Sequence, residues 1–314
     1  MKNILKPLKA VYSYYLPETR EIISNITRKY PHNIFLKSTT SGLDDFHFGI
    51  IKAYKEYFKN DVIGFEKFKY IYPTIGSSEG IFHLLSYIAT HRQKIPIYVF
   101  EGEYEGYAGY GNNLGLSFEK INQNIDFKKI KKGIFFISNP SAINGNIIPN
   151  KIIKKINDAG HEIAYDGTYF GMTKVHKFIL NYPSIKWLFV SFSKPFGLYY
   201  YRLGLCFSTE ELKTLAPNKW FKNIFSLIIA ENILKKIKKN YLYTKYEKFQ
   251  KQAILLFQKQ YFIKPKKSDV FLLSYLEEKD MSSELKEKFK EYKRGKYYRF
   301  CLTNYFRKIE KQSY

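Results

Sequence analysis

Short apolar runs alternate with helical patterns along the chain, and this alternation restricts the fold more than any other feature of the sequence. Each run is too short to be a buried helix, and apolar residues recur at helical spacing in the segments between several of them. The runs, which we expect to form buried strands, are residues 70–75, 95–100, 133–138, 161–165, 187–190 and 203–207. Strands that alternate with helices favour a three-layer α/β/α domain built on a mostly parallel sheet.

A second, smaller domain is expected from the two ends of the chain. A long helix is predicted at residues 220–234, and helix and strand patterns continue to alternate after it. We therefore predict a large domain at residues 35–240 and a small α+β domain formed by residues 1–34 and 241–314.

The composition predicts a folded protein in a reducing compartment. The chain has 314 residues, of which 45% are hydrophobic and 18% aromatic, which is enough for a substantial core. No apolar run reaches the roughly 18 residues of a membrane span, and the N-terminus lacks the apolar segment of a signal peptide. Cys206 and Cys301 lie far apart in apolar runs, so we expect buried free thiols, no disulfide or metal framework and a cytoplasmic location.

The net charge of +24 raises the question of a nucleic-acid partner. The lysines are dispersed, however, and the clusters at 128–132 and 235–239 are interrupted by Ile130 and Ile237. This pattern is typical of the solvated faces of amphipathic helices. Abundant Lys, Asn, Ile, Tyr and Phe also indicate an AT-rich genome, which enriches lysine without a functional cause. The charge therefore does not favour a nucleic-acid partner.

A glycine-rich turn, Gly-Ser-Ser-Glu-Gly at 76–80, follows the first apolar run and precedes a helical pattern. Unpaired N–H groups at a helix N-terminus, together with the hydroxyls of Ser77 and Ser78, make this turn a candidate anion site. Alternatively, one of the serines is a helix N-cap. The turn also matches the G-x-S-x-G motif of α/β-hydrolases, with Ser78 as nucleophile. That fold needs a histidine late in the chain, and the last histidine is His176, so the hydrolase interpretation is not favoured.

Ionisable side chains stand at or near the ends of expected strands. Asp166 follows the run at 161–165, and Lys194 lies shortly after the run at 187–190. Burial lowers the pKa of a lysine and makes its amine nucleophilic, whereas a buried carboxylate is costly unless a cation needs it. Alternatively, Lys194 is an ordinary surface lysine and Asp166 caps a turn. Arg299, in a late apolar run, likewise invites a carboxylate, with a structural salt bridge as the alternative.

The order of these motifs resembles that of the class I/II aminotransferases, fold-type-I enzymes that depend on pyridoxal 5'-phosphate (PLP). The residues that carry the resemblance are Ser77, Ser78, Tyr104, Asn139, Asp166, Tyr169, Ser191, Lys194, Arg202 and Arg299. The resemblance implies the same α/β fold and PLP as the cofactor. No G-x-G-x-x-G, P-loop or zinc motif competes with this interpretation.

The resemblance also implies a role for each residue at the cofactor ring. Lys194 forms the Schiff base and then acts as general base, and Asp166 holds the protonated ring nitrogen. Tyr104 stacks on the ring, whereas Asn139 and Tyr169 reach its phenolic oxygen.

Two further contacts are implied for charged groups. Arg299 binds the α-carboxylate of the substrate. The residues that hold the cofactor phosphate are Ser77, Ser78, Ser191 and Arg202.

The asparagine loop matches the family imperfectly. Aligning it on Gly145 places Ala142 where the family has its asparagine, whereas aligning it on Asn139 keeps the asparagine but inserts residues before the glycine. We favour Asn139, because its distance to the next motif is nearer to the family's. Gly102 replaces the proline that usually stands two positions before the stacking residue, and no residue here matches the tyrosine that usually reaches the partner subunit's phosphate.

The resemblance predicts a cytoplasmic, homodimeric aminotransferase that acts on an α-amino acid and a 2-oxo acid. Alternatives on the same scaffold are elimination, decarboxylation or oxidation of an amino acid. A non-catalytic basic binding protein is disfavoured, because such a scaffold need not keep Lys194, Asp166 and Arg202 together. No metal and no membrane partner is expected.

Overall fold

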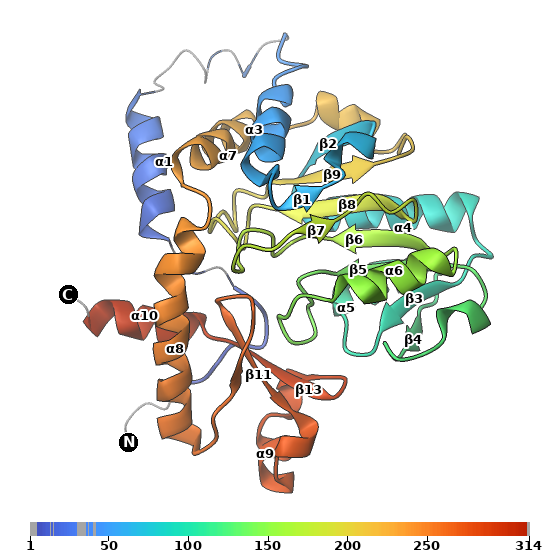
Figure 1. The fold of residues 1–314 in the computed structure, drawn as a ribbon. Helices are drawn as coiled ribbons and strands as arrows, with labels where there is room; N and C mark the ends of the chain where they lie inside the picture. Colours follow the sequence, from blue (N-terminus) through green and yellow to red (C-terminus); the bar gives the residue numbers. More distant parts are fainter. Residues whose placement is uncertain are drawn as a thin grey trace.

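A large sheet and a smaller sheet organise the molecule (Figure 1). The structure is a computed structural model that describes residues 5–12, 14, 16–29, 36, 38–39 and 42–312.

The large sheet has seven strands in the order β2-β9-β8-β6-β5-β3-β4. They are β2 (Tyr70–Thr74), β3 (Ile97–Phe100), β4 (Glu119–Ile121), β5 (Ile134–Ser138), β6 (Glu162–Asp166), β8 (Ile185–Ser191) and β9 (Gly204–Ser208). Strand β9 is antiparallel to both of its neighbours, and all the other adjacent pairs are parallel. The predicted three-layer α/β fold with a mostly parallel sheet is confirmed.

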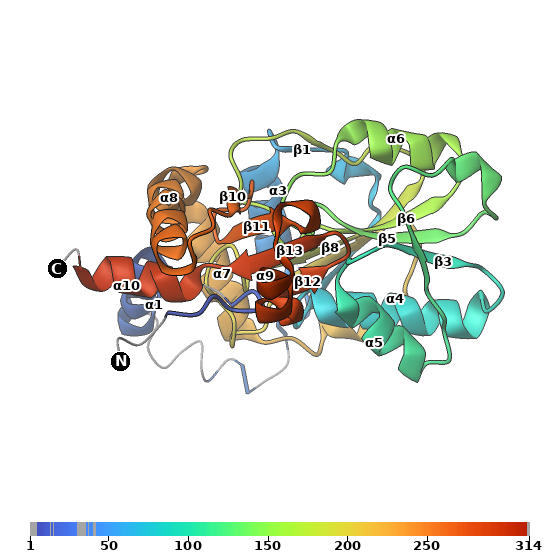
Figure 2. The same cartoon turned by 90° about the horizontal axis from the view of Figure 1, so that it is seen from below.

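Apolar side chains on both faces of this sheet explain why its strands read as continuous apolar runs. In β8, Trp187 and Phe189 belong to one core cluster, and Leu188 and Val190 belong to a second cluster on the opposite face. Helices cover both faces (Figure 2). The first cluster lies under α4 (Ser77–His91) and α5 (Glu105–Asn113), and the second under α3 (Phe48–Phe58), α6 (Asn150–Asp158) and α7 (Ile224–Lys236).

The smaller sheet is antiparallel, in the order β10-β11-β13-β12. Its strands are β10 (Lys266–Lys267), β11 (Leu273–Glu277), β12 (Lys293–Arg294) and β13 (Tyr297–Cys301), accompanied by α8 (Tyr241–Tyr261), α9 (Ser283–Lys288) and α10 (Thr303–Gln312). The remaining helix and strands are α1 (Pro17–Lys29), β1 (Val62–Ile63) and β7 (Phe178–Ile179), and β1 pairs with β7 in parallel.

The N-terminal segment at 5–12 is held against the smaller sheet. Leu8 and Cys301 exchange two backbone hydrogen bonds of 3.0 Å. The Thr303 hydroxyl donates to the carbonyl of Tyr12 at 2.8 Å, and the Tyr292 hydroxyl donates to that of Pro7 at 2.9 Å. These bonds fix the backbone at 10–12, which forms one wall of the site described below.

The helix predicted at 220–234 begins later than expected. Helix α7 starts at Ile224, because the side chain of Asn223 caps it by accepting a hydrogen bond from the Ser226 amide at 3.1 Å. Trp220 follows a 3-10 turn outside the helix and is half-exposed.

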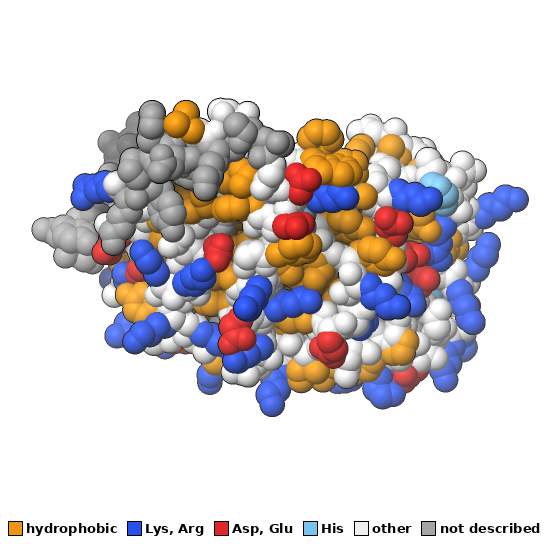
Figure 3. All heavy atoms as spheres, turned by 90° about the horizontal axis from the view of Figure 1, so that it is seen from above, with side chains coloured by type: hydrophobic (Ala, Val, Ile, Leu, Met, Phe, Trp, Pro, Cys, Tyr) orange, Lys and Arg blue, Asp and Glu red, His pale blue; other side chains and the backbone are white. Residues whose placement is uncertain are grey.

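Lysine and arginine side chains are scattered over the face in Figure 3 among hydrophobic and acidic side chains, rather than gathered in one patch. In the described part of the chain, no helix combines the length and the apolar character needed to cross a membrane.

Candidate active site

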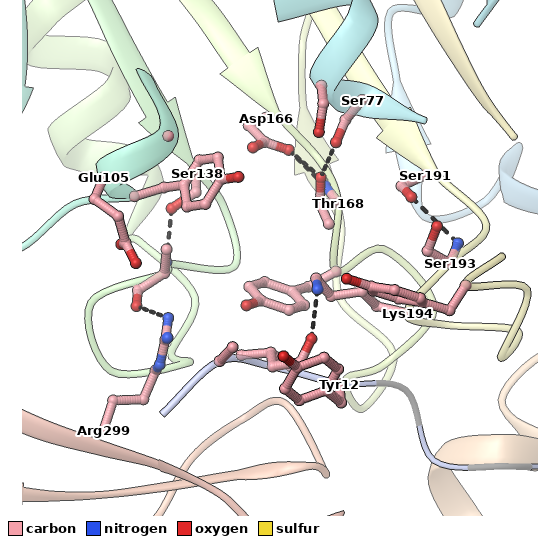
Figure 4. Close-up of a pocket in the computed structure, with 18 of the residues that line it drawn as sticks. Tyr12, Ser77, Glu105, Ser138, Asp166, Thr168, Ser191, Ser193, Lys194 and Arg299 are labelled. Carbon is pink, nitrogen blue, oxygen red and sulfur yellow. Dashed lines mark hydrogen bonds between the residues drawn. The ribbon is translucent and has the colours of Figure 1, made fainter. Parts of the chain in front are cut away.

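A pocket of about 540 Å³ lies where the parallel strands of the large sheet end (Figure 4). Ser138, Asp166 and Ser191 are the last residues of β5, β6 and β8, and all three line the pocket. Because the carboxyl ends of parallel strands meet at one edge of a sheet, such edges are the usual ligand sites of α/β folds. Arg299 on β13 and the backbone at 10–12 complete the pocket from the smaller sheet.

Nine of the ten residues predicted for the site line this single pocket. They are Ser77, Ser78, Tyr104, Asp166, Tyr169, Ser191, Lys194, Arg202 and Arg299.

Lys194 follows β8 and reaches into the pocket (Figure 4). Its Nζ donates a hydrogen bond to the carbonyl of Val11 at 2.6 Å and lies 6.0 Å from the centre of the Tyr199 ring. Burial lowers the pKa of Lys194 to about 8. A lysine with this pKa is largely uncharged under mildly alkaline conditions, so its amine can act as a nucleophile or a base.

Asp166 is a buried carboxylate with three hydrogen-bond donors. Thr168 donates to Oδ1 through its amide at 2.9 Å and its hydroxyl at 2.5 Å, and the Tyr107 hydroxyl donates to Oδ2 at 2.9 Å. Burial raises the pKa of Asp166, and hydrogen bonds from Thr168 and Tyr107 oppose this rise. No lysine, arginine or histidine among the described residues forms a salt bridge with Asp166, so the site can accept a cationic ring nitrogen.

The N-terminus of α4 forms an anion site together with Arg202. Ser77 and Ser78 begin the helix, and no side chain caps it in the described structure. The Arg202 guanidinium donates to the Ile75 carbonyl at 2.9 Å and lies 3.4 Å from the Ser193 hydroxyl. The free helix N–H groups, the helix dipole and the guanidinium all favour a phosphate here.

Gly76 allows this close approach of Arg202 to the helix. Its φ of +94° is unfavourable for other residues, and a Cβ at this position would lie 2.8 Å from Nη2 of Arg202.

Tyr104 and Tyr169 supply aromatic surface to the pocket. Tyr104 lies against Gly106, where a Cβ would come within 2.3 Å of its ring, and it makes an edge contact with Tyr107 at 5.2 Å between centroids. Burial raises the pKa of both Tyr104 and Tyr169 to about 12, so both hydroxyls stay protonated and can donate hydrogen bonds.

Arg299 is buried at the end of the pocket nearest the smaller sheet. Nη1 donates to the carbonyl of Ala142, Nη2 donates to that of Lys9 at 3.1 Å, and Nε has no hydrogen-bond partner in the described structure. None of the described carboxylates forms a salt bridge with it, so the alternative of a structural salt bridge finds no support. Burial lowers the pKa of Arg299, and a carboxylate ligand would offset the cost of this buried charge.

Asn139 is the one predicted residue that the structure keeps out of the pocket. Its side chain exchanges two hydrogen bonds with the backbone of Ile148, accepting at 2.9 Å and donating at 3.3 Å. Ala142 lines the pocket instead, as the alignment on Gly145 would place it. The prediction of Asn139 as a cofactor ligand therefore finds no support in this geometry, because its amide is hydrogen-bonded to the backbone of its own loop.

Sequence reasoning missed an acid that ties two parts of the pocket together. Glu103 is buried, and it accepts hydrogen bonds from the Ser138 hydroxyl at 2.5 Å and the Tyr104 amide at 2.9 Å. Ser138 Oγ in turn accepts from the Ala142 amide at 2.6 Å. Burial raises the pKa of Glu103 to about 7. Its place three residues after an expected strand was the signal available in the sequence.

Other residues missed by sequence reasoning hold or line the pocket. Tyr107 is one of 29 tyrosines and carries no local signal, whereas Thr168 follows Asp166 by two residues and could have been found as a turn partner. Arg294 and Glu105 form an ion pair that also lines the pocket.

A comparison with protein families shows to which family the chain belongs. The model of the family described as aminotransferase class I and II matches residues 27–287. The chain belongs to this family. It is thus a PLP-dependent enzyme, and PLP is its cofactor. A search of curated protein sequences finds no significant match.

Solved structures with this fold catalyse different reactions. One is YbdL from Escherichia coli, with an identified methionine aminotransferase function, at 12% identity and a TM-score of 0.68, covering 96% of this chain and 90% of YbdL. Another is the PLP-bound C-S lyase from Staphylococcus hominis, at 13% identity and a TM-score of 0.70, covering 98% of this chain and 89% of the lyase. A third is the L-threonine-O-3-phosphate decarboxylase from Porphyromonas gingivalis, at 13% identity and a TM-score of 0.63, covering 98% of both chains. At these identities the likeness supports the fold alone.

The residues of the pocket fit PLP. They provide a buried amine, a carboxylate without a salt-bridge partner, a helix N-terminus beside an arginine, and aromatic walls. The one departure is Ala142, which has no polar side chain to offer the cofactor's phenolic oxygen.

Proposed function

We propose that this enzyme is an aminotransferase that moves the amino group of an α-amino acid to a 2-oxo acid. Lys194 is the covalent attachment point of PLP and the base that removes the Cα proton. The observation that carries the proposal is the buried Lys194 amine, in one pocket with the Asp166 carboxylate and the Arg299 guanidinium.

Bound PLP supplies the electron sink for the bonds to Cα. Asp166, oriented by hydrogen bonds from Tyr107 and Thr168, would hold a proton on the ring nitrogen. Tyr169 would donate to the phenolic oxygen, and Tyr104 would cover the ring, since both side chains line the pocket. The Lys194 amine, whose pKa burial lowers to about 8, would hold the cofactor and would be the group that accepts and returns a proton at Cα.

The phosphate is assigned to the N-terminus of α4. Ser77, Ser78, Ser191 and Arg202 surround this part of the pocket. Their donors would hold the phosphate there, and this would orient the cofactor for reaction at Lys194.

Arg299 is assigned to the α-carboxylate of the substrate. The two carbonyls that hold it fix the plane of the guanidinium, and its Nε is left without a partner in the described structure. A guanidinium fork binds a carboxylate through two hydrogen bonds, which sets the orientation of the Cα–H bond.

The same residues would also serve elimination, decarboxylation or oxidation of an amino acid. A carboxylate held by a buried arginine favours reactions that keep the carboxylate, so transamination is preferred over decarboxylation. A non-catalytic binding protein is disfavoured, because the catalytic constellation of Lys194, Asp166 and Arg299 is complete.

We also propose a homodimer in the cytoplasm, in which each chain has a large domain at 35–240 and a small domain made of 1–34 and 241–314. Exposed aromatic side chains that line the pocket or the neighbouring cleft are compatible with the dimer, because an interface between subunits would cover them. They are Tyr12, Tyr200 and Phe221. Free buried Cys206 and Cys301 support a reducing compartment.

The reaction is tested by measuring which products form. PLP-loaded enzyme is mixed with single amino acids and a 2-oxo acid acceptor, and the new amino acid, ammonia and carbon dioxide are each measured. Transamination gives the new amino acid in equal amount to the consumed one. Release of ammonia would instead show elimination or oxidation, and release of carbon dioxide would show decarboxylation.

The role of Lys194 is tested by its capture of PLP. Because only the uncharged amine is nucleophilic, the rate at which the cofactor-free protein captures PLP should rise with pH through about 8. Borohydride followed by peptide mapping should place the reduced adduct on Lys194, and Lys194→Arg should abolish it, whereas Lys213→Arg on the exposed surface should not. An adduct on another lysine would overturn the assignment.

A further inference from the structure

The pocket contains a second guanidinium, and this one has a carboxylate partner. Arg294 on β12 lines the pocket together with Arg299. Both of its terminal nitrogens donate to the carboxylate of Glu105 at the start of α5, one of them at 2.9 Å. Figure 4 shows Glu105 on the same side of the pocket as Arg299.

Tight backbone packing fixes the two partners opposite each other. A Cβ at Gly102 would lie 2.5 Å from the amide nitrogen of Gly295, and a Cβ at Gly295 would lie 2.8 Å from the carbonyl of Glu101. Both glycines have positive φ, of +84° and +57°. The turn that carries Arg294 therefore packs directly against the loop that leads to Glu105. The ion pair joins strand β12 of the smaller sheet to helix α5 and forms one wall of the pocket together with Arg299.

The two arginines of this wall differ in what neutralises them. The side chain of Arg294 is only 10% exposed, so its charge needs a partner, and Glu105 supplies it. Burial raises the pKa of Glu105, but hydrogen bonds and the charge of Arg294 outweigh burial and lower it, so Glu105 stays ionised. Arg299 forms no salt bridge with a described carboxylate; the charge of Glu105 acts on it only at longer range.

Aromatic and small side chains also line the pocket. Among them are the tyrosines at 12, 104, 110, 199 and 200 and the small or aliphatic residues Ala10, Val11 and Ala142. These residues suit an apolar or aromatic side chain of the substrate, and none of them is a cation that could bind a second carboxylate.

We propose that Glu105 is a specificity-determining residue, which occupies Arg294 and thereby restricts the enzyme to amino acids with uncharged side chains. The inference rests on the proposed function and names its substrate class. A dicarboxylic substrate would have to displace Glu105 from both nitrogens of Arg294. The displaced carboxylate would then lie beside the second carboxylate of the substrate, and this repulsion selects against acidic side chains.

The test compares unreactive carboxylates of equal length. Binding of glutarate and of valerate to PLP-loaded enzyme is followed through the visible absorbance of the cofactor, in the wild type and in Glu105→Gln. The variant frees Arg294, so the affinity for glutarate should rise about tenfold or more, while that for valerate changes less than about threefold. The matched control Glu287→Gln, in an exposed ion pair on α9, should change neither.

A double variant assigns the gain to Arg294. Glu105→Gln with Arg294→Gln should lose the added glutarate affinity and keep its valerate affinity. If the wild type binds glutarate as tightly as Glu105→Gln does, or if the gain survives in the double variant, the inference is overturned.

Turnover separates this inference from the proposed function. In the wild type, neutral amino acids should react at least about tenfold faster in kcat/KM than glutamate, and Glu105→Gln should narrow that ratio. If no amino acid yields a 2-oxo acid, the proposed function fails, but the binding comparison still decides the role of Glu105.

Discussion

Asp166 and Lys194 show how burial acts in opposite directions on two residues of one pocket. Burial raises the pKa of Asp166, and hydrogen bonds from Thr168 and Tyr107 oppose this rise because they stabilise the ionised carboxylate. Burial lowers the pKa of Lys194, and the hydrogen-bond partner of its amine among the described residues is the backbone carbonyl of Val11. The pocket thus presents an anion for the ring nitrogen and a readily deprotonated amine for the reacting carbon.

Tyr107 is predicted to position Asp166 for the ring nitrogen. Tyr107→Phe removes the donor to Oδ2 and should weaken PLP binding roughly tenfold, because a hydrogen bond to a charged group contributes about 1.5–3 kcal/mol. Affinity for a PLP analogue with carbon in place of the ring nitrogen should change little. Equal losses for PLP and the analogue would show that Tyr107 only supports the fold. Tyr87→Phe on α4 is the control.

Arg299 is predicted to bind the α-carboxylate. Arg299→Ala should lower kcat/KM by about 2–5 kcal/mol, and Arg299→Lys should recover little, because an ammonium group cannot reproduce the two parallel hydrogen bonds of a guanidinium. Decarboxylated amines should be poor substrates of the wild type. If simple amines react as well as the corresponding amino acids, Arg299 has a structural role.

At the scale of elements, the buried strands could be predicted from the sequence. Each has apolar residues on both faces, so it appears as a continuous apolar run, and each run ends at a turn or a polar residue. The sequence could not decide between Asn139 and Ala142, because the direction of an amide in a loop depends on backbone hydrogen bonds to Ile148. The Glu105–Arg294 ion pair could not be predicted from the sequence for another reason. Its partners are 189 residues apart and meet only when the two sheets pack together.

The start of helix α4 is predicted to depend on Gly76. Gly76→Ala would place a side chain at positive φ and against Arg202, so it should weaken PLP binding and lower the free energy of unfolding by about 1–2 kcal/mol. Gly109→Ala on α5, where a Cβ meets no atom within 4 Å, should be neutral or stabilising by up to about 1 kcal/mol. Titration with PLP and chemical denaturation measure the two effects. Wild-type PLP affinity in Gly76→Ala would argue against a phosphate at this helix.

For the whole molecule, the pocket depends on both sheets and on the chain's beginning. The large sheet contributes Lys194 and Asp166, and the smaller sheet contributes Arg299. The backbone of Val11 and Tyr12 lies between them, held by Lys194 and Thr303. Substrate binding and the packing of the two sheets are therefore coupled, and substitutions at their contact should change affinity together with stability.

Two such molecules are predicted to associate through the face around Phe221. Phe221 is 78% exposed and lines a small cleft with Arg202 and Ile75 beside the predicted phosphate site, whereas Phe262 is 93% exposed at the end of α8. If the face around Phe221 is the dimer interface, Phe221→Glu should shift the protein towards monomer in sedimentation velocity and weaken PLP binding. Phe262→Glu introduces the same charge at a more exposed phenylalanine and should leave the dimer intact. A dimer unaffected by Phe221→Glu would place the interface elsewhere, and a wild-type monomer with full turnover would show that one chain is sufficient.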